Sequence, residues 1–133
     1  MTWHKITKDK LTVNVINSPA MGTIYHNTAD KPKLIIASVV IYSGDDGFGN
    51  LGADIDVYTG SSSPPTDNIS TTSNVTMYTY YDYGTMNWLF VTSFTEMWET
   101  ICFIVMPGEY YKLVQNAYPG NCYIVFMREH EIG

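Results

Sequence analysis

The sequence predicts an all-β fold built as an antiparallel sandwich, and three observations lead to this expectation. Short runs of β-branched and aromatic residues recur along the 133 residues, separated by clusters of Gly, Pro, Asn, Asp and Ser. No segment has the apolar period of a long amphipathic helix. Hydrophobic residues make up 45% and charged residues 15%, which favours a folded core over disorder. With no internal repeat and no composition boundary, residues 1–133 are expected to form a single domain.

The expected strands follow one another with turns between them. Over residues 10–16, Leu11, Val13 and Val15 alternate with polar residues, as in a half-buried strand. Residues 33–42 are the strongest strand. Residues 59–73 contain the sequence SSSPP and are expected to be a surface excursion. Further strands are expected at residues 3–8, 22–26, 53–58, 74–83, 87–94, 98–106, 110–116 and 122–128.

Three of these runs are apolar on both faces, namely residues 34–41, 101–106 and 123–127. A strand in a simple sandwich shows one face to water and should alternate, so a second apolar face needs cover. The sequence offers no helix for this, and another subunit is the favoured source; the alternative is that insertions and the 59–73 excursion fold over the sheet. The expected subunit contacts are Ile36, Val40, Phe103, Val105 and Val125.

The charge balance excludes several partners. Thirteen acidic residues against seven Lys and Arg give a formal net charge of −6, which disfavours nucleic acid and anionic membranes. No run of about 18 apolar residues is present, so no membrane insertion is expected. The N-terminus leads into an alternating segment and not into a signal-peptide hydrophobic region, so synthesis in the cytoplasm without export is expected.

The residues that usually carry catalysis or bind metal are scattered. His4, His26 and His130 have no ligand spacing, and the two cysteines lack a C-x-x-C arrangement, so we expect no metal, no cofactor and no enzymatic activity. Cys102 and Cys122 each lie in an apolar run and are expected to be buried, reduced thiols.

Two further groups of acidic residues are expected to be ordinary surface. Asp54 and Asp56 share one face of a strand, and this face is expected to be solvated. Glu96 and Glu99 are expected in a surface turn, and the glycine-rich residues 43–50 (SGDDGFGN) in a plain loop without a phosphate or calcium site.

The most unusual local composition is residues 77–88 (MYTYYDYGTMNW). Tyr and Trp provide large, fairly rigid contact area with a polar group, as binding surfaces do. Rings are expected on both faces of this strand, so at least one face is not ordinary solvent surface. Contact with a ligand or receptor and packing between subunits both remain open. The candidate binding residues are Tyr78, Tyr80, Tyr81, Tyr83 and Trp88.

Three segments resemble small β domains of phage tail-fibre and receptor-binding proteins. Residues 3–7 (WHKIT) are similar to their W-x-x-V-T opening, and residues 22–32 (GTIYHNTADKP) to their G-T-x-Y-x-N-T-T-G-K-P segment. Residues 103–111 (FIVMPGEYY) resemble their F-x-V-P-P-G-x-x-Y segment. Asn27 and Pro32 are expected to shape one turn, and Pro107 with Gly108 another.

The resemblance implies a jelly-roll-like sandwich that forms a homotrimer at a virion tip. It departs from the family pattern at Asp30, where a turn Gly is usual, and at Met106, where the first Pro of the pair is usual. Residues 60–99 are longer than the family norm and are the candidate variable insert that faces a receptor. No family site residue maps onto this insert.

These expectations converge on a non-enzymatic protein of the virion surface, with other virion proteins and a host-surface glycan or protein as partners. One hypothesis is host attachment at a tail fibre, needle or baseplate tip. Because the chain has no shaft sequence, a capsid decoration or cement protein is the alternative, and a stand-alone carbohydrate-binding lectin is a further one.

Overall fold

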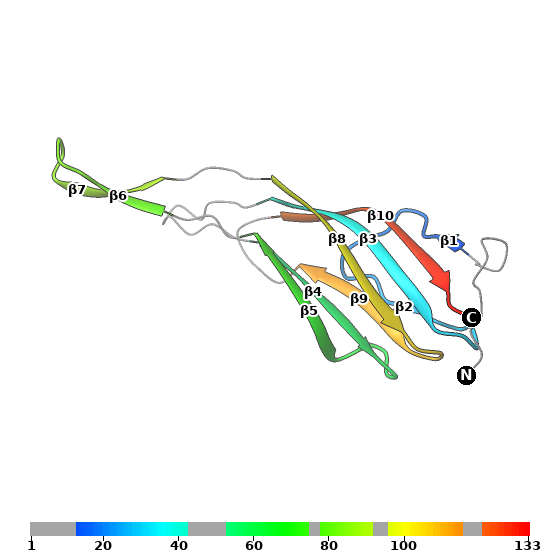
Figure 1. Ribbon diagram of the computed structural model, residues 1–133. Coiled ribbons are helices and arrows are strands. Elements are labelled where there is room, and N and C mark those ends of the chain that lie inside the picture. Colours follow the sequence, from blue (N-terminus) through cyan, green and yellow to red (C-terminus); the bar gives the residue numbers. More distant parts are fainter. Residues whose placement is uncertain (1–12, 43–52, 75–77, 92–95, 116–120) are drawn as a thin grey trace, which may run out of the picture.

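The computed structural model describes residues 13–42, 53–74, 78–91, 96–115 and 121–133, and for residues 74, 78–82 and 88–91 it describes the backbone alone. Within these residues two four-stranded antiparallel sheets pack against each other, as Figure 1 shows. The predicted all-β, antiparallel architecture is therefore confirmed. The expected strand at residues 3–8 and the glycine-rich segment at residues 43–50 lie outside the described residues.

Sheet A contains the strands with the longest apolar runs. Its order is β1 (Val13–Val15), β10 (Asn121–Glu131), β3 (Lys33–Tyr42) and β8 (Glu96–Val105). The three runs that are apolar on both faces are the neighbouring strands β10, β3 and β8. The register of β10 against β3 shifts between Ile124 and Phe126, which marks a bulge in β10.

Sheet B is shorter and more polar. Its order is β2 (Tyr25–His26), β9 (Tyr110–Gln115), β4 (Ala53–Gly60) and β5 (Asp67–Asn74). Apolar residues of β4 and β9 point toward sheet A, while polar residues such as Asp54 and Lys112 occupy the other face. This is the alternation that a sheet packed on one face should have.

Strand β5 corrects the expected surface excursion at residues 59–73. The SSSPP stretch does form the connection after β4, but residues 67–74 pair with β4 in an antiparallel ladder. Their Thr, Ser and Asn side chains suit an edge strand, because such a strand has little apolar surface to bury and has one polar edge. The polar composition of residues 67–74 is therefore the reason that β5 was not predicted as a strand.

The core lies between the two sheets. Strand β3 contributes Ile35, Val39 and Ile41, and β4 contributes Ile55 and Val57, all of them fully buried. Because β-strand side chains alternate, each of these residues is two or four positions from the next one on its strand. Tyr111, Leu113, Phe103, Val105 and Met127 complete the centre of this core.

A separate hairpin extends from one end of the sandwich. It consists of β6 (Tyr78–Asp82) and β7 (Asn87–Val91), which pair with each other and with no other described strand. Figure 1 shows this hairpin beyond the sheets, at the end opposite the C-terminus. The predicted insert at residues 60–99 is thus only partly an insert, because β5 and the start of β8 belong to the two sheets.

Two turns form as the sequence predicts. The buried Asn27 donates from Nδ2 to the carbonyls of Lys31 (2.9 Å) and Val105 (3.1 Å), and its Oδ1 accepts from the amide of Ala29 (3.1 Å). At the second turn, Gly108 has φ +82°, and the amide of Glu109 donates to the carbonyl of Met106 (3.0 Å). A glycine fits this position because few other residues adopt a positive φ.

Candidate functional site

The outer face of sheet A, the face turned away from sheet B, is the principal candidate surface. Alternation along β3 turns Ile35 and Val39 toward the core, so Leu34, Ile36 and Val40 point outward. Most of the exposed large hydrophobic side chains of the described residues belong to the strands of this sheet. They are Val13, Val15, Trp98, Ile104, Tyr123, Val125 and Phe126.

One end of this face is aromatic. Trp98 and Tyr123 are the register neighbours of Val40 on its two sides. Both rings are exposed, at 60% and 54%, whereas Val40 is only 3% exposed because it lies between them. The Tyr42 ring packs edge-on against Tyr123, with 6.0 Å between ring centroids. The indole N–H of Trp98 donates a hydrogen bond to Oε1 of Glu96, which restrains the ring.

The other end of the face is aliphatic and basic. Arg128 lies between Val15 and Ile36, and His130 lies between Val13 and Leu34. The guanidinium carbon of Arg128 lies 5.8 Å from the centroid of the Phe126 ring, within cation–π range. Among the described residues, Nε of Arg128 and Nε2 of His130 are buried without a hydrogen-bond partner.

Sequence reasoning placed these residues poorly. Glu96 and Glu99 were expected in a turn, but both lie in β8 together with Trp98. Trp98 was correctly expected at the start of a strand, but its position next to Val40, with Tyr123 on the other side of Val40, was not foreseen. The available signal was the two-residue period from Trp98 through Thr100 and Cys102 to Ile104.

The expected subunit contacts divide into two groups. Phe103 and Val105 belong to the chain's own core, and Val40 is also buried, so these side chains leave no surface for another subunit. Ile36 is half-buried on the outer face, and Val125 is exposed at the bulge. The error has a simple cause, since a run that is apolar on both faces does not reveal which residues point inward.

The predicted ligand-binding residues all belong to the hairpin. Its register pairs Tyr81 with Trp88, Tyr80 with Leu89 and Tyr78 with Val91. The side chains of Tyr78, Tyr80, Tyr81 and Trp88 lie outside the described part of the structure. At the tip, Tyr83 is 82% exposed and Met86 is 71% exposed. The hairpin therefore presents two large side chains to solvent, far from the core (Figure 1).

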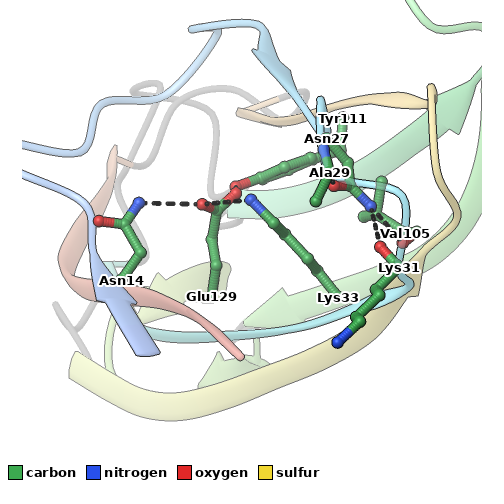
Figure 2. A network of polar contacts seen from close by, with 8 residues as sticks. All are labelled: Asn14, Asn27, Ala29, Lys31, Lys33, Val105, Tyr111 and Glu129. Carbon is green, nitrogen blue, oxygen red and sulfur yellow. Dashed lines mark hydrogen bonds and ion pairs between the residues drawn. The ribbon is translucent and has the colours of Figure 1, made fainter. Parts of the chain in front are cut away.

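A polar network inside the sandwich was not predicted (Figure 2). The carboxylate of Glu129 accepts hydrogen bonds from Nδ2 of Asn14 (3.0 Å) and from the Tyr111 hydroxyl (2.6 Å), and it forms an ion pair with Nζ of Lys33 (3.3 Å). Burial, and then the hydrogen bond and charge of Glu129, raise the pKa of Tyr111 well above its ordinary value. With three donors on one buried carboxylate, the network is a structural link between the sheets.

The two acidic residues of β4 share a face, as predicted, but this face is not fully solvated. Asp56 is buried, and its Oδ1 accepts a 2.7 Å hydrogen bond from the Thr71 hydroxyl on β5. Oδ1 of Asp54 is buried without a partner. In the described part of the chain, no three His, Cys, Asp or Glu side chains gather as a metal site would require.

Both cysteines are free, but only Cys122 is buried, which corrects the expectation for Cys102. Burial, and next the nearby charge of Asp54, raise the pKa of the Cys122 thiol to about 11. Such a thiol stays protonated at neutral pH and is a poor nucleophile. Cys102 lies exposed on the outer face of sheet A, beside Ile36.

A search for helices that could span a membrane gives none among the residues that the structure describes. No protein-family model matches the chain, and a search of the curated proteins gives no relative. The candidate surfaces are therefore assigned from residues and geometry.

Proposed function

We propose that this chain is a non-enzymatic binding module of a phage virion surface, which assembles as a homotrimer and contacts the host. The observation that carries the proposal is the outer face of sheet A, an exposed apolar surface on an otherwise complete sandwich. Monomeric soluble proteins rarely expose large contiguous apolar patches, and such patches usually mark an interaction site.

The strand pairing supports the finer proposal of a jelly roll. Leaving aside the hairpin β6–β7, the described residues form eight strands in the two sheets, and these strands pair in a nested way. The first pairs with the last (β1 with β10), the second with the seventh (β2 with β9), the third with the sixth (β3 with β8) and the fourth with the fifth (β4 with β5). An eight-stranded double hairpin that folds over in this way gives the two sheets of a jelly roll.

The composition of the outer face supports self-association. Trp98, Tyr123 and Phe126 are the residue types that are enriched in protein interfaces, and Val13, Val15 and Ile104 add aliphatic surface beside them. Ile36 and Val125 are the two residues of the original subunit-contact prediction that remain available on this face. Closed rotational symmetry, such as a trimer, would cover the face in every copy.

The hairpin is the proposed host-contacting element. It projects from the end of the sandwich opposite the C-terminus (Figure 1), and its tip exposes Tyr83 and Met86. An aromatic ring with a hydroxyl group suits contact with a sugar ring or with a protein surface. A trimer would present three such hairpins and would strengthen a weak individual contact through multivalency.

The resemblance of three segments to tail-fibre domains is the reason for placing the module on a virion. Capsid decoration is the second candidate function, and the same apolar outer face favours it, because that face could pack on a capsid subunit instead of on another copy. The two functions differ in what covers sheet A and in whether the hairpin binds the host.

The first test is the mass in solution, measured by light scattering after size exclusion. Three chains of 15.0 kDa give about 45 kDa for the proposed closed trimer. A trimer supports the proposal, whereas a stable monomer at every accessible concentration contradicts it. Binding of the labelled protein to host cells and to purified capsids then separates attachment from decoration.

A further inference from the structure

Two side chains on the outer face of sheet A each have a buried polar atom without a hydrogen-bond partner. Among the described residues, three buried side-chain atoms have no hydrogen-bond partner, namely Oδ1 of Asp54, Nε of Arg128 and Nε2 of His130. The last two belong to the same face of β10 and are two positions apart, at a spacing of roughly 7 Å along a strand. A buried N–H without an acceptor costs about 1–3 kcal/mol, so such groups need an explanation.

The surroundings of these atoms are apolar. Val13 and Leu34 flank His130 on the neighbouring strands, and Val15 and Ile36 flank Arg128. Val13 and Val15 are themselves exposed. The basic groups thus lie among aliphatic side chains, and Arg is one of the residue types that are enriched in protein interfaces.

The carboxylate of Glu129 does not accept hydrogen bonds from these groups. Glu129 lies between Arg128 and His130 in sequence, but it points to the opposite side of the sheet. Inside the sandwich it is bonded to Tyr111, Lys33 and Asn14 (Figure 2). The contact of Arg128 with the Phe126 ring orients the guanidinium group but accepts none of its N–H groups in a conventional hydrogen bond.

We propose that a second copy of this chain covers this end of sheet A and brings a carboxylate, toward which the half-buried side chains of Arg128 and His130 turn to donate hydrogen bonds. The inference rests on the proposed self-association and names the contact at its centre. Charge complementarity favours a copy as the occupant. With 13 acidic residues against 7 Lys and Arg, the chain is strongly acidic, whereas Arg128 and His130 make this part of its surface locally basic.

The planar guanidinium group of Arg128 suits such a carboxylate, because two parallel N–H groups can bind both oxygens. Removal of the charge should therefore weaken assembly more than removal of a surface cation elsewhere. Lys112 provides the matched control. It is a half-buried cation on β9 of sheet B, with Nζ over the Tyr58 ring at 5.2 Å, and it lies on the face away from sheet A.

The experiment measures the dissociation constant of the oligomer by sedimentation for the full chain and for Arg128→Gln, Arg128→Lys and Lys112→Gln. We expect Arg128→Gln to raise the constant by roughly tenfold or more, Arg128→Lys to raise it less, and Lys112→Gln to leave it unchanged. Raising the salt concentration should weaken the assembly of the full chain and have less effect on Arg128→Gln. Thermal unfolding of each variant checks that it is folded.

The outcomes separate this inference from the proposed function. If the full chain assembles and Arg128→Gln assembles equally well with the same salt dependence, the carboxylate contact is wrong and self-association stands. If the full chain is a monomer at every concentration and binds purified capsids through this face, both the second copy and the proposed trimer are wrong. If Arg128→Gln is unfolded, the salt dependence of the full chain and the Arg128→Lys variant still decide the question.

Discussion

The hydroxyl group of Tyr111 donates a 2.6 Å hydrogen bond to Oε2 of Glu129 in the interior of the sandwich. Tyr111 belongs to β9 of sheet B and Glu129 to β10 of sheet A, so this bond joins the two layers (Figure 2). The other oxygen of the carboxylate holds Lys33 and Asn14. A polar link of this kind restricts how the sheets can slide, because a shifted sheet would leave a buried carboxylate without its donors.

Removal of the Tyr111 hydroxyl should weaken the fold. Tyr111→Phe keeps the ring in the core but leaves Oε2 of Glu129 without its donor, so the free energy of unfolding should fall by about 1–3 kcal/mol. Urea denaturation measures the change. Tyr110→Phe is the control, because Tyr110 is half-buried and its ring stacks on His26 outside the buried network of Glu129. Equal losses in both variants would contradict a special role for the bond.

The side chain of Asn27 should matter as much as a core residue. Asn27→Ala removes three hydrogen bonds and leaves the buried carbonyl of Val105, the carbonyl of Lys31 and the amide of Ala29 without this partner, so we expect a loss of about 2–4 kcal/mol. Asn17→Ala changes an exposed asparagine and should cost under about 0.5 kcal/mol. Thermal unfolding of the two variants checks this. A small loss of stability for Asn27→Ala would count against the importance of its side-chain hydrogen bonds in this turn.

The two thiols should differ in reactivity. At pH 8 in the folded protein, Cys102 should react readily with a thiol reagent, because it is exposed, and Cys122 should react slowly, because it is buried and its pKa is raised to about 11. We expect one thiol per chain to react quickly in the folded protein and both thiols to react quickly in denaturant. A second copy that covers sheet A would also slow Cys102, so the reaction should be faster in dilute than in concentrated protein.

Alkaline pH should destabilise the protein through its protonated core groups. The folded-state pKa of Cys122 is raised from 9.0 to about 11, so the unfolded chain loses this proton first. The contribution of the protonated Cys122 thiol to the free energy of unfolding is complete below pH 9 and is lost as the pH rises toward 11. Tyr111 acts in the same direction. The midpoint of urea denaturation should therefore decrease as the pH rises from 9 to 11, and it should decrease less in Cys122→Ala. A midpoint that is independent of pH would contradict this assignment.

Truncation of inner and outer isoleucines should affect different properties. Ile55→Ala makes a cavity in the core and should cost about 2–5 kcal/mol of stability. Ile104→Ala, on the outer face of sheet A, should change the stability of the monomer by under about 0.5 kcal/mol but weaken assembly. Unfolding and light scattering on the same samples test the pair, and unchanged assembly in Ile104→Ala would remove this residue from the contact.

The sequence predicted much of the fold because its strands carry strong local signals. The run at residues 33–42 has the bounds of β3, and the runs ending at Met106 and beginning at Cys122 match β8 and β10 closely. Asn27 and the Pro107–Gly108 pair were correctly placed in turns, since their conformations follow from local chemistry. Strand β5 was missed because its residues are polar, and polar residues at a sheet edge look like a loop.

The candidate site was harder to predict. Whether the side chains of Phe103 and Val105 point inward or outward depends on the side of their strand on which the second sheet lies. A run that is apolar on both faces does not indicate that side. The hydrogen bond between Tyr111 and Glu129 joins two residues that no local sequence pattern connects. Arg128 and His130 were not singled out, because a short basic spot becomes unusual only when its apolar neighbours from three strands are known.

The bulge in β10 decides which side of the sheet each later residue takes. Before it, Cys122 and Ile124 point inward; after it, Met127 and Glu129 do, because Val125 is one residue more than β3 can pair. If β10 kept all of its residues but paired with β3 without the bulge, it would continue the earlier parity, which would turn Arg128 and His130 into the core and expel Glu129. The one unpaired residue therefore decides which side chains reach the core, whereas deletion of Val125 would straighten the ladder and leave Arg128 and His130 on the outer face.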